Sequence, residues 1–224
     1  MGKIEFRTIA IEETIRALAD FFSALCNDPA ITKKKRDKFS RWAEDLEKIL
    51  EQISLFEKHA VPLITADLEY TFGHRNLVLT AMMQPGTRTI YSEIKTVFEH
   101  DPKFPVSPED LDFLITAPDT AASLAWVGDT AIKYAFLFSV RQKEITPEKL
   151  HDSRKALETN ENLSELCDRW HLYRYRFYQD SPEPQQKKLE KIKGTFTEAI
   201  FGVIFVEKGI EGVLKALPLI DTKQ

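Results

Sequence analysis

The residues with the clearest chemical potential are two carboxylates on apolar stretches that lie far apart in the sequence. Asp129 follows Gly128 inside the apolar run Ala121–Val140, and Glu198 stands at the head of a second apolar run that follows Gly194. A glycine inside a helix costs about 1 kcal/mol relative to alanine, and an ionised aspartate on an apolar helix costs more unless a partner compensates it. Two adjacent departures of this kind favour a functional role, although close helix packing at Gly128 and a buried hydrogen bond to Asp129 would also explain them.

A divalent cation would offset the electrostatic repulsion between these two side chains if they lie close together. If the two stretches form crossing helices with Asp129 opposite Glu198, the carboxylates repel each other and need a cation between them. Oxygen ligands suit Mg²⁺, with Mn²⁺ as an alternative, and Mg²⁺ keeps several waters and accepts only one or two protein carboxylates. The pair therefore predicts a magnesium site.

Helices must position these residues, because the hydrophobic pattern is helical along the chain. Apolar residues recur at three- and four-residue steps over Ile11–Cys26 and again from Phe39 to Phe56, which predicts an antiparallel helical hairpin that ends at Pro62. Further helices are expected over residues 76–83, 89–99, 121–140, 147–159, 161–171, 185–206 and 209–217. The sequence contains no alternating strand pattern, so the predicted fold class is all-α.

The same pattern divides the chain into two parts. Pro62 and the short stretch after it form the best candidate boundary, which predicts residues 1–64 as an N-terminal helical hairpin extension and residues 65–218 as the main domain. Prolines interrupt Asp101–Pro118, so the central helix is expected to begin after Pro118, with Asp119 or Thr120 as its N-cap.

Composition narrows the functional class. The chain has 224 residues and a formal net charge of −4, which disfavours nucleic-acid binding unless the basic residues gather on one face. Two widely spaced cysteines argue against a disulfide framework, and carboxylates near the N-terminus argue against an export signal. Asp129 and Lys133 interrupt the longest apolar run and disfavour a membrane span. We therefore expect a cytoplasmic protein without a membrane partner.

The segments around the two carboxylates resemble the endonuclease domain of the ribonuclease III family. In that family a helix with a Leu-Glu-Phe-Leu-Gly-Asp-like motif faces a later helix with an Asp-x-x-Glu-Ala-like motif, and the acids bind magnesium. Leu124–Asp129 (Leu-Ala-Trp-Val-Gly-Asp) is similar to the first motif, and Glu198 and Ala199 match the end of the second. Four residues depart from the full-length family pattern, which has acids at the first three of these positions and histidine at the fourth: Ala122, Ala125, Thr195 and Gln84.

The Mini-III branch of the family is more similar, because its first motif looks like Leu-Ala-Tyr-Met-Gly-Asp and its second also lacks the extra aspartate. Lys149–Lys155 resembles the Lys-Leu-His segment of that branch, and Leu68–Met82 is similar to the opening of full-length domains. The resemblance covers about residues 67–217 and includes no double-stranded-RNA-binding domain. The hairpin before residue 67 has no counterpart in this pattern. Archaeal ribonuclease-III-like proteins are a candidate group for a chain with such an extension.

The resemblance implies a magnesium-dependent endoribonuclease that acts as a homodimer on double-stranded or structured RNA. Asp129 and Glu198 would then be the catalytic residues and the metal ligands. Duplex RNA would be recognised by its shape and its phosphates and not by base sequence. The candidate RNA-binding residues flank the two motifs, and solvated helix faces would explain the same lysines: Arg154, Lys155, Lys187, Lys188, Lys191 and Lys193.

Two other function classes stay open. The departures from the full-length pattern favour a catalytically silent member that binds RNA or a ribonucleoprotein, and the acidic net charge favours a dimeric protein-interaction scaffold. A basic run, Thr32–Arg36, opens the second helix of the hairpin, where cations disfavour a helix start. Contact with RNA or another partner at this run is a further hypothesis.

Overall fold

The structure is a computed structural model that describes residues 6–98, 100–140, 146, 148, 160–177 and 185–220. Within these residues the protein is helical, with one isolated bridge between Met83 and Phe177, so the all-α prediction is confirmed. The elements are α1 (Ile11–Cys26), α2 (Lys33–Leu68), α3 (Arg75–Ala81), α4 (Thr87–Phe98), α5 (Pro108–Val140), α7 (Asn160–Arg169), α8 (Gln186–Ala216) and the 3-10 helix η1 (Leu217–Leu219). The helix predicted over residues 147–159 lies outside the described residues.

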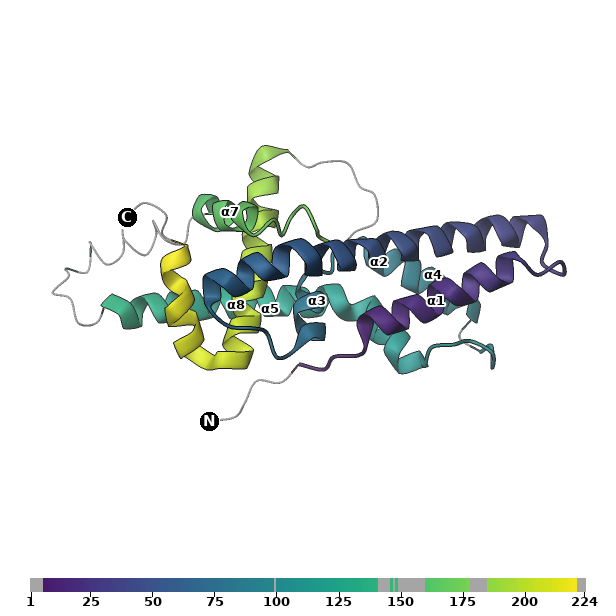
Figure 1. Cartoon of the computed structure of the whole chain (residues 1–224), viewed down its shortest axis with the longest axis horizontal. Coiled ribbons are helices and arrows are strands. Elements are labelled where there is room, and N and C mark those ends of the chain that lie inside the picture. Colours follow the sequence, from purple (N-terminus) through teal and green to yellow (C-terminus); the bar gives the residue numbers. More distant parts are fainter. Residues whose placement is uncertain are drawn as a thin grey trace.

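Helices α1 and α2 form the predicted antiparallel hairpin, which extends as a long arm from the rest of the molecule (Figure 1). Its outer part is held to α4 by an aromatic cluster of Phe22 from α1, Phe39 and Trp42 from α2, and Phe98 from α4. The ring centroids in this cluster lie 5.1–6.4 Å apart, a range in which aromatic pairs stabilise packing by about 0.5–1.5 kcal/mol beyond burial. The hairpin is therefore part of the hydrophobic core and not a loose appendage.

Two helices continue through prolines at which the sequence pattern predicted an end or a start. Helix α2 passes Pro62 and ends at Leu68, and α5 begins at Pro108 and passes Pro118. A proline removes one backbone hydrogen bond, but buried side chains continue on the same helix face beyond Pro62 and before Pro118, and their packing keeps both helices intact. The predicted helix end at Pro62 and the predicted cap at Asp119 or Thr120 are therefore wrong. The division into residues 1–64 and 65–218 stays a prediction.

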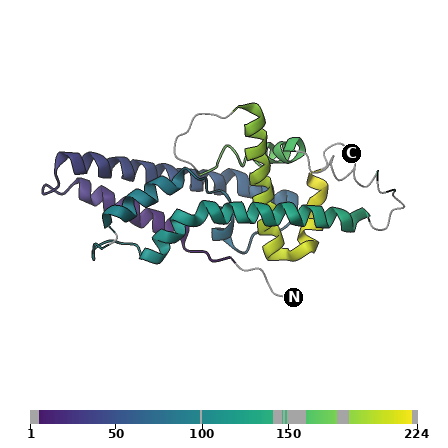
Figure 2. The same ribbon diagram turned by 180° about the vertical axis from the view of Figure 1, so that it is seen from behind.

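Helix α5 is the central element, and α8 crosses it at a steep angle (Figure 2). Helix α7 packs on α8, and Trp170, just after α7, connects three elements. Its ring stacks on Phe201 of α8 with centroids 6.3 Å apart, and its indole N–H donates to Asp67 near the end of α2 at 2.8 Å. The inner end of the hairpin is thus tied to the helix pair that carries both carboxylates.

The last part of α8 turns at Gly209, whose φ of 64° lies in the left-handed region that glycine adopts without strain. Just before this turn, the carboxylate of Glu207 accepts hydrogen bonds from the backbone N–H groups of Gly73 and His74, at 3.0 and 2.7 Å. The predicted closing helix after residue 209 is confirmed. Within the described part of the chain, no helix combines the length and the apolar character that crossing a membrane requires.

Candidate active site

Helices α5 and α8 touch backbone to backbone at two glycines. A Cβ atom added to Gly128 of α5 would lie 1.8 Å from the backbone oxygen of Glu198, and one added to Gly202 of α8 would lie 2.1 Å from the backbone oxygen of Leu124. No larger residue fits either position without moving the helices apart. The close-packing explanation of Gly128 is therefore correct, and the same contact brings the two acidic segments together.

The crossing places Asp129 and Glu198 in each other's electrostatic field. Asp129 directly follows the glycine that faces the backbone of Glu198, and its side chain is 32% exposed. Burial raises the pKa of Glu198 from its ordinary value of 4.5 to about 7, with a further contribution from the negative charge of Asp129. Lys133 and Lys191 act in the opposite direction. The two carboxylates singled out in the sequence thus form one local acid pair.

Lys133 is a third member of this cluster that the sequence reasoning missed as a site residue. Its ammonium group donates to Oδ2 of Asp129 at 2.6 Å, one helical turn along α5. Aspartate and lysine four residues apart face each other on a helix, so the spacing in the sequence could have predicted this pair. A metal ion bound to Asp129 would compete with the Lys133 ammonium group for the Asp129 carboxylate.

The acid pair can satisfy only part of a metal's coordination shell. Within the described ranges no group of three or more His, Cys, Asp or Glu side chains could hold a metal ion. Zinc sites need three or four protein ligands, whereas Mg²⁺ binds through one or two carboxylates and several waters. A half-buried carboxylate with a raised pKa beside a second carboxylate fits the latter ion, because a divalent cation would relieve their mutual repulsion.

The penalty for ionising Glu198 predicts a pH-dependent effect of its replacement. The folded-state pKa lies above the ordinary value, so the folded protein binds this proton more tightly than the unfolded chain, and stability is lost as the pH rises from about 4.5 through 7. With a chelator present, Glu198→Gln is expected to raise the melting temperature at pH 8 and to change it little at pH 4.5. Differential scanning calorimetry at both pH values measures this, and an equal effect at both would contradict the buried, acid-repelled state of Glu198.

The predicted RNA-binding lysines fall into different groups. Lys187, Lys188 and Lys191 are exposed on the first turns of α8. The helical period of about 100° per residue places Lys187 and Lys191 within about 20° of the direction of Glu198, whereas Lys188 points about 80° away from it. Lys193 donates to Asp168 at 2.7 Å, with 16% of its side chain exposed, so its role here is structural. Arg154 and Lys155 lie outside the described residues.

A second feature missed in the sequence is an apolar patch on the exposed side of α5. Trp126 is 73% exposed, and Tyr134 and Leu137 are about half exposed. We call these three residues the α5 patch. Large apolar side chains that gather on one part of a surface often mark an interaction site, whereas scattered single ones do not. The patch lies on the helix that also carries Asp129.

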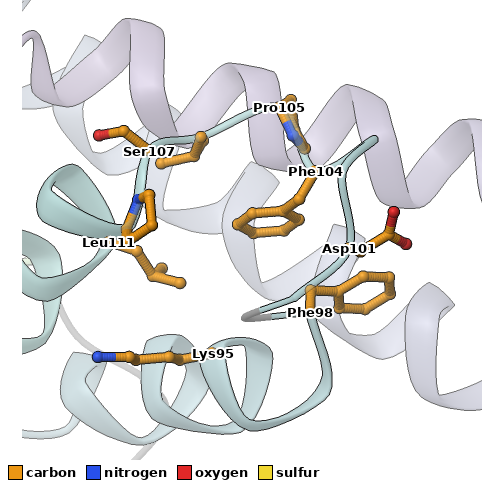
Figure 3. Close-up of a pocket in the computed structure, with 9 residues that line it drawn as sticks. Lys95, Phe98, Asp101, Phe104, Pro105, Ser107 and Leu111 are labelled. Atoms are coloured by element: carbon orange, nitrogen blue, oxygen red, sulfur yellow. The ribbon is translucent and has the colours of Figure 1, made fainter.

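The pocket between the end of α4 and the start of α5 is a different site from the acid pair. It has a volume of about 290 Å³ and is lined by the rings of Phe98 and Phe104 with Lys95 and Asp101 at its edge (Figure 3). Lys95 donates to Asp112 at 2.6 Å, and the Asp101 side chain accepts from the backbone of Lys103 at 2.8 Å. Its polar groups are thus engaged, and it offers no pair of carboxylates.

One known protein family matches the part of the chain that contains the acid pair. Residues 122–209 match the family model of the ribonuclease III domain, a range that includes the glycine contact, Asp129, Lys133 and Glu198. The match supports a ribonuclease III family domain at residues 122–209. The ribonuclease III family comprises endoribonucleases that process double-stranded RNA and generally depend on a divalent metal. The match does not include residues 67–121, which the sequence resemblance had added to the domain, and no curated protein matches the chain.

Proposed function

We propose that this ribonuclease III domain is a magnesium-dependent endoribonuclease that cleaves double-stranded or structured RNA. The observation that carries the proposal is the acid pair at the glycine crossing, where burial, with a further contribution from the negative charge of Asp129, raises the pKa of Glu198 to about 7. A fold that brings two acids together against their repulsion is suited to hold a divalent cation. The family match supports the same chemistry.

Each residue of the site has a separate role in this proposal. Asp129 and Glu198 would hold the metal, which when bound would supply Lewis-acid polarisation of the scissile phosphate and a lowered pKa for an attacking water. The backbone contact between Gly128 and α8 fixes the separation of the two carboxylates, since neither helix can shift without breaking it. Lys133 carries the countercharge of Asp129 when no metal is bound and must yield at least part of that carboxylate to the metal.

The RNA is held by its phosphates. Lys187 and Lys191 lie along the face of α8 that leads to Glu198, and we propose that these two contact the backbone next to the cleaved bond. We also propose that Lys188 contacts phosphates, on a neighbouring face of α8. Arg154 and Lys155 remain candidate phosphate contacts, and both lie outside the described residues. Recognition through phosphates and shape gives affinity that falls with salt and little preference for base sequence.

We further propose that the protein is a homodimer formed through the α5 patch. A two-fold axis repeats the acid pair once for each strand of a duplex, and a tryptophan that is 73% exposed, with Tyr134 and Leu137 further along the same helix, is a suitable anchor for such an interface. Trp126→Glu is expected to weaken dimerisation at least 100-fold, because the interface would then bury two carboxylates. Sedimentation velocity measures the change.

The matched control for this variant is Val97→Glu. Val97 is an apolar residue of α4 that is 48% exposed and lies outside the α5 patch, so its replacement should leave the dimer unchanged. A wild-type protein that sediments as a monomer at micromolar concentration would contradict the dimer. So would equal dissociation of both variants.

The experiment that tests the activity compares RNA substrates and metals. The full chain is incubated with a labelled duplex RNA and with one of its single strands, each with Mg²⁺ or with a chelator. Cleavage of the duplex that requires Mg²⁺ supports the enzyme. Salt-sensitive binding of the duplex without cleavage would instead support a silent RNA-binding protein, a second candidate that the ion pair between Lys133 and Asp129 favours.

A further inference from the structure

We propose that the tip of the α1–α2 hairpin is a second binding site for the phosphate backbone of duplex RNA, separate from the acid pair. The hairpin tip is defined here by Lys33, Lys34, Lys35 and Arg36, the first four residues of α2, which are all exposed. It forms the free end of the long arm in Figure 1. This inference rests on the proposed function, since it takes duplex RNA as the ligand.

The charges of the hairpin tip are not neutralised within the described part of the chain. Arg36 donates to the backbone oxygens of Asp28 and Ile31, both at 3.3 Å, and so stabilises the turn. No carboxylate forms an ion pair with Lys33, Lys34 or Lys35 among the described residues. The three lysines therefore carry net positive charge at the end of the arm.

The position of these lysines is unfavourable for the helix itself. The N-terminus of a helix carries a partial positive charge, so acids stabilise the first turn and cations destabilise it. The first turn of α2 has no acidic residue, and Thr32 makes no side-chain capping hydrogen bond. Such an arrangement is stabilised by an anionic partner, which would interact with the lysines and with the helix terminus together.

Duplex RNA suits this arrangement better than an acidic segment of a protein. Three successive helical residues point in directions about 100° apart, so the tip is basic on several sides and has no single apolar contact face. A duplex presents phosphates along two strands and needs no fixed side-chain pocket. Because the whole chain has a net charge of −4, RNA affinity requires local concentrations of positive charge, and the tip is one.

The length of α2 sets how far this site lies from the catalytic helices. Its 36 residues correspond to about 54 Å at 1.5 Å per residue. Near the inner end, Asp67 contacts Trp170, which stacks on α8. A duplex must therefore span a distance on the order of 50 Å to contact both regions. The tip would select long duplexes.

The test neutralises the tip in the full chain and measures RNA binding without cleavage. The variant Lys33→Gln, Lys34→Gln, Lys35→Gln is compared with the control Lys58→Gln, Lys103→Gln, Lys215→Gln, which removes the same charge from exposed lysines elsewhere. The probe is a capped duplex of about 30 base pairs in chelator over a range of salt, with a capped duplex of about 10 base pairs for comparison. We expect the tip variant to bind the long duplex at least tenfold more weakly and to lower the salt slope by about 2. The control should change affinity less than twofold, and neither variant should affect the short duplex.

The outcomes separate this inference from the proposed function. If the wild-type chain shows no salt-sensitive binding to either duplex, the proposed RNA-dependent function fails. If it binds but the tip variant matches the control on the long duplex, the hairpin tip is not an RNA site and the proposed function stands. If the tip variant keeps its RNA affinity and loses binding to polyglutamate, the tip belongs to an acidic protein partner and the RNA inference is overturned.

Discussion

Asp129→Asn and Glu198→Gln are each expected to lower the rate of duplex RNA cleavage by about 1,000-fold or more, the scale of losing one electrostatic contact to the reacting group. Each change keeps the shape of the side chain and removes one of the two negative charges that hold the metal. Single-turnover cleavage at saturating Mg²⁺ measures the effect on the chemical step. RNA affinity in chelator should not fall, because a carboxylate repels phosphates and its neutralisation removes no attractive contact.

The matched control is Asp119→Asn on the same helix. Asp119 is 68% exposed and pairs with Arg88 at 2.6 Å, so its replacement should leave cleavage within about twofold of the wild type, as for most surface substitutions. Unfolding cannot explain an inactive Glu198→Gln variant, because that change is expected to stabilise the protein at neutral pH and above. Cleavage by either acid variant within tenfold of wild type would remove that residue from the site.

Gly128→Ala is expected to destabilise the protein by about 3 kcal/mol or more, at the upper end of the range for overpacked cores. The new Cβ atom would lie 1.8 Å from the backbone oxygen of Glu198, and a backbone atom cannot turn aside as a flexible side chain can. The helices must therefore separate, which also moves the two carboxylates apart. For a domain of this size the melting temperature should fall by roughly 6–12 °C, and metal-dependent cleavage should fall with it at temperatures where the variant is folded.

Gly73→Ala is the control for this prediction. No atom lies within 4 Å of the position that its Cβ would occupy, and its backbone N–H still reaches Glu207. Its melting temperature should stay within about 2 °C of the wild type, as expected for a change well below 1 kcal/mol. If Gly128→Ala melts at the wild-type temperature, the backbone contact between α5 and α8 does not exist as described.

The elements that the sequence predicted best are those whose signal is local. The periodic apolar residues of α1 gave its exact bounds, Ile11–Cys26, because each turn buries one side chain on the same face. The importance of Gly128 and Asp129 was also visible locally, since each is unfavourable on an apolar helix without a compensating contact. The break at Gly209 follows from the conformational freedom of glycine in the same way.

The elements that the sequence predicted poorly depend on contacts between distant segments. Pro62 and Pro118 were expected to delimit helices, but buried neighbours on the same face carry both helices past them. The exposure of Trp126 could not be read from an apolar run, because the pattern does not distinguish a core face from a face left open for a partner. The ion pair between Lys133 and Asp129 is different, because it is local and its four-residue spacing could have predicted it.

The most direct measurement of the central claim is a crystal structure of the protein soaked with Mn²⁺, with data collected at a wavelength that gives anomalous signal from this metal. We expect an anomalous peak between the carboxylates of Asp129 and Glu198 at the crossing of α5 and α8, with the Lys133 ammonium group moved from Oδ2 of Asp129. A soak at saturating Mn²⁺ that leaves this position without a peak, and Lys133 still paired with Asp129, would contradict the metal site and the nuclease mechanism built on it.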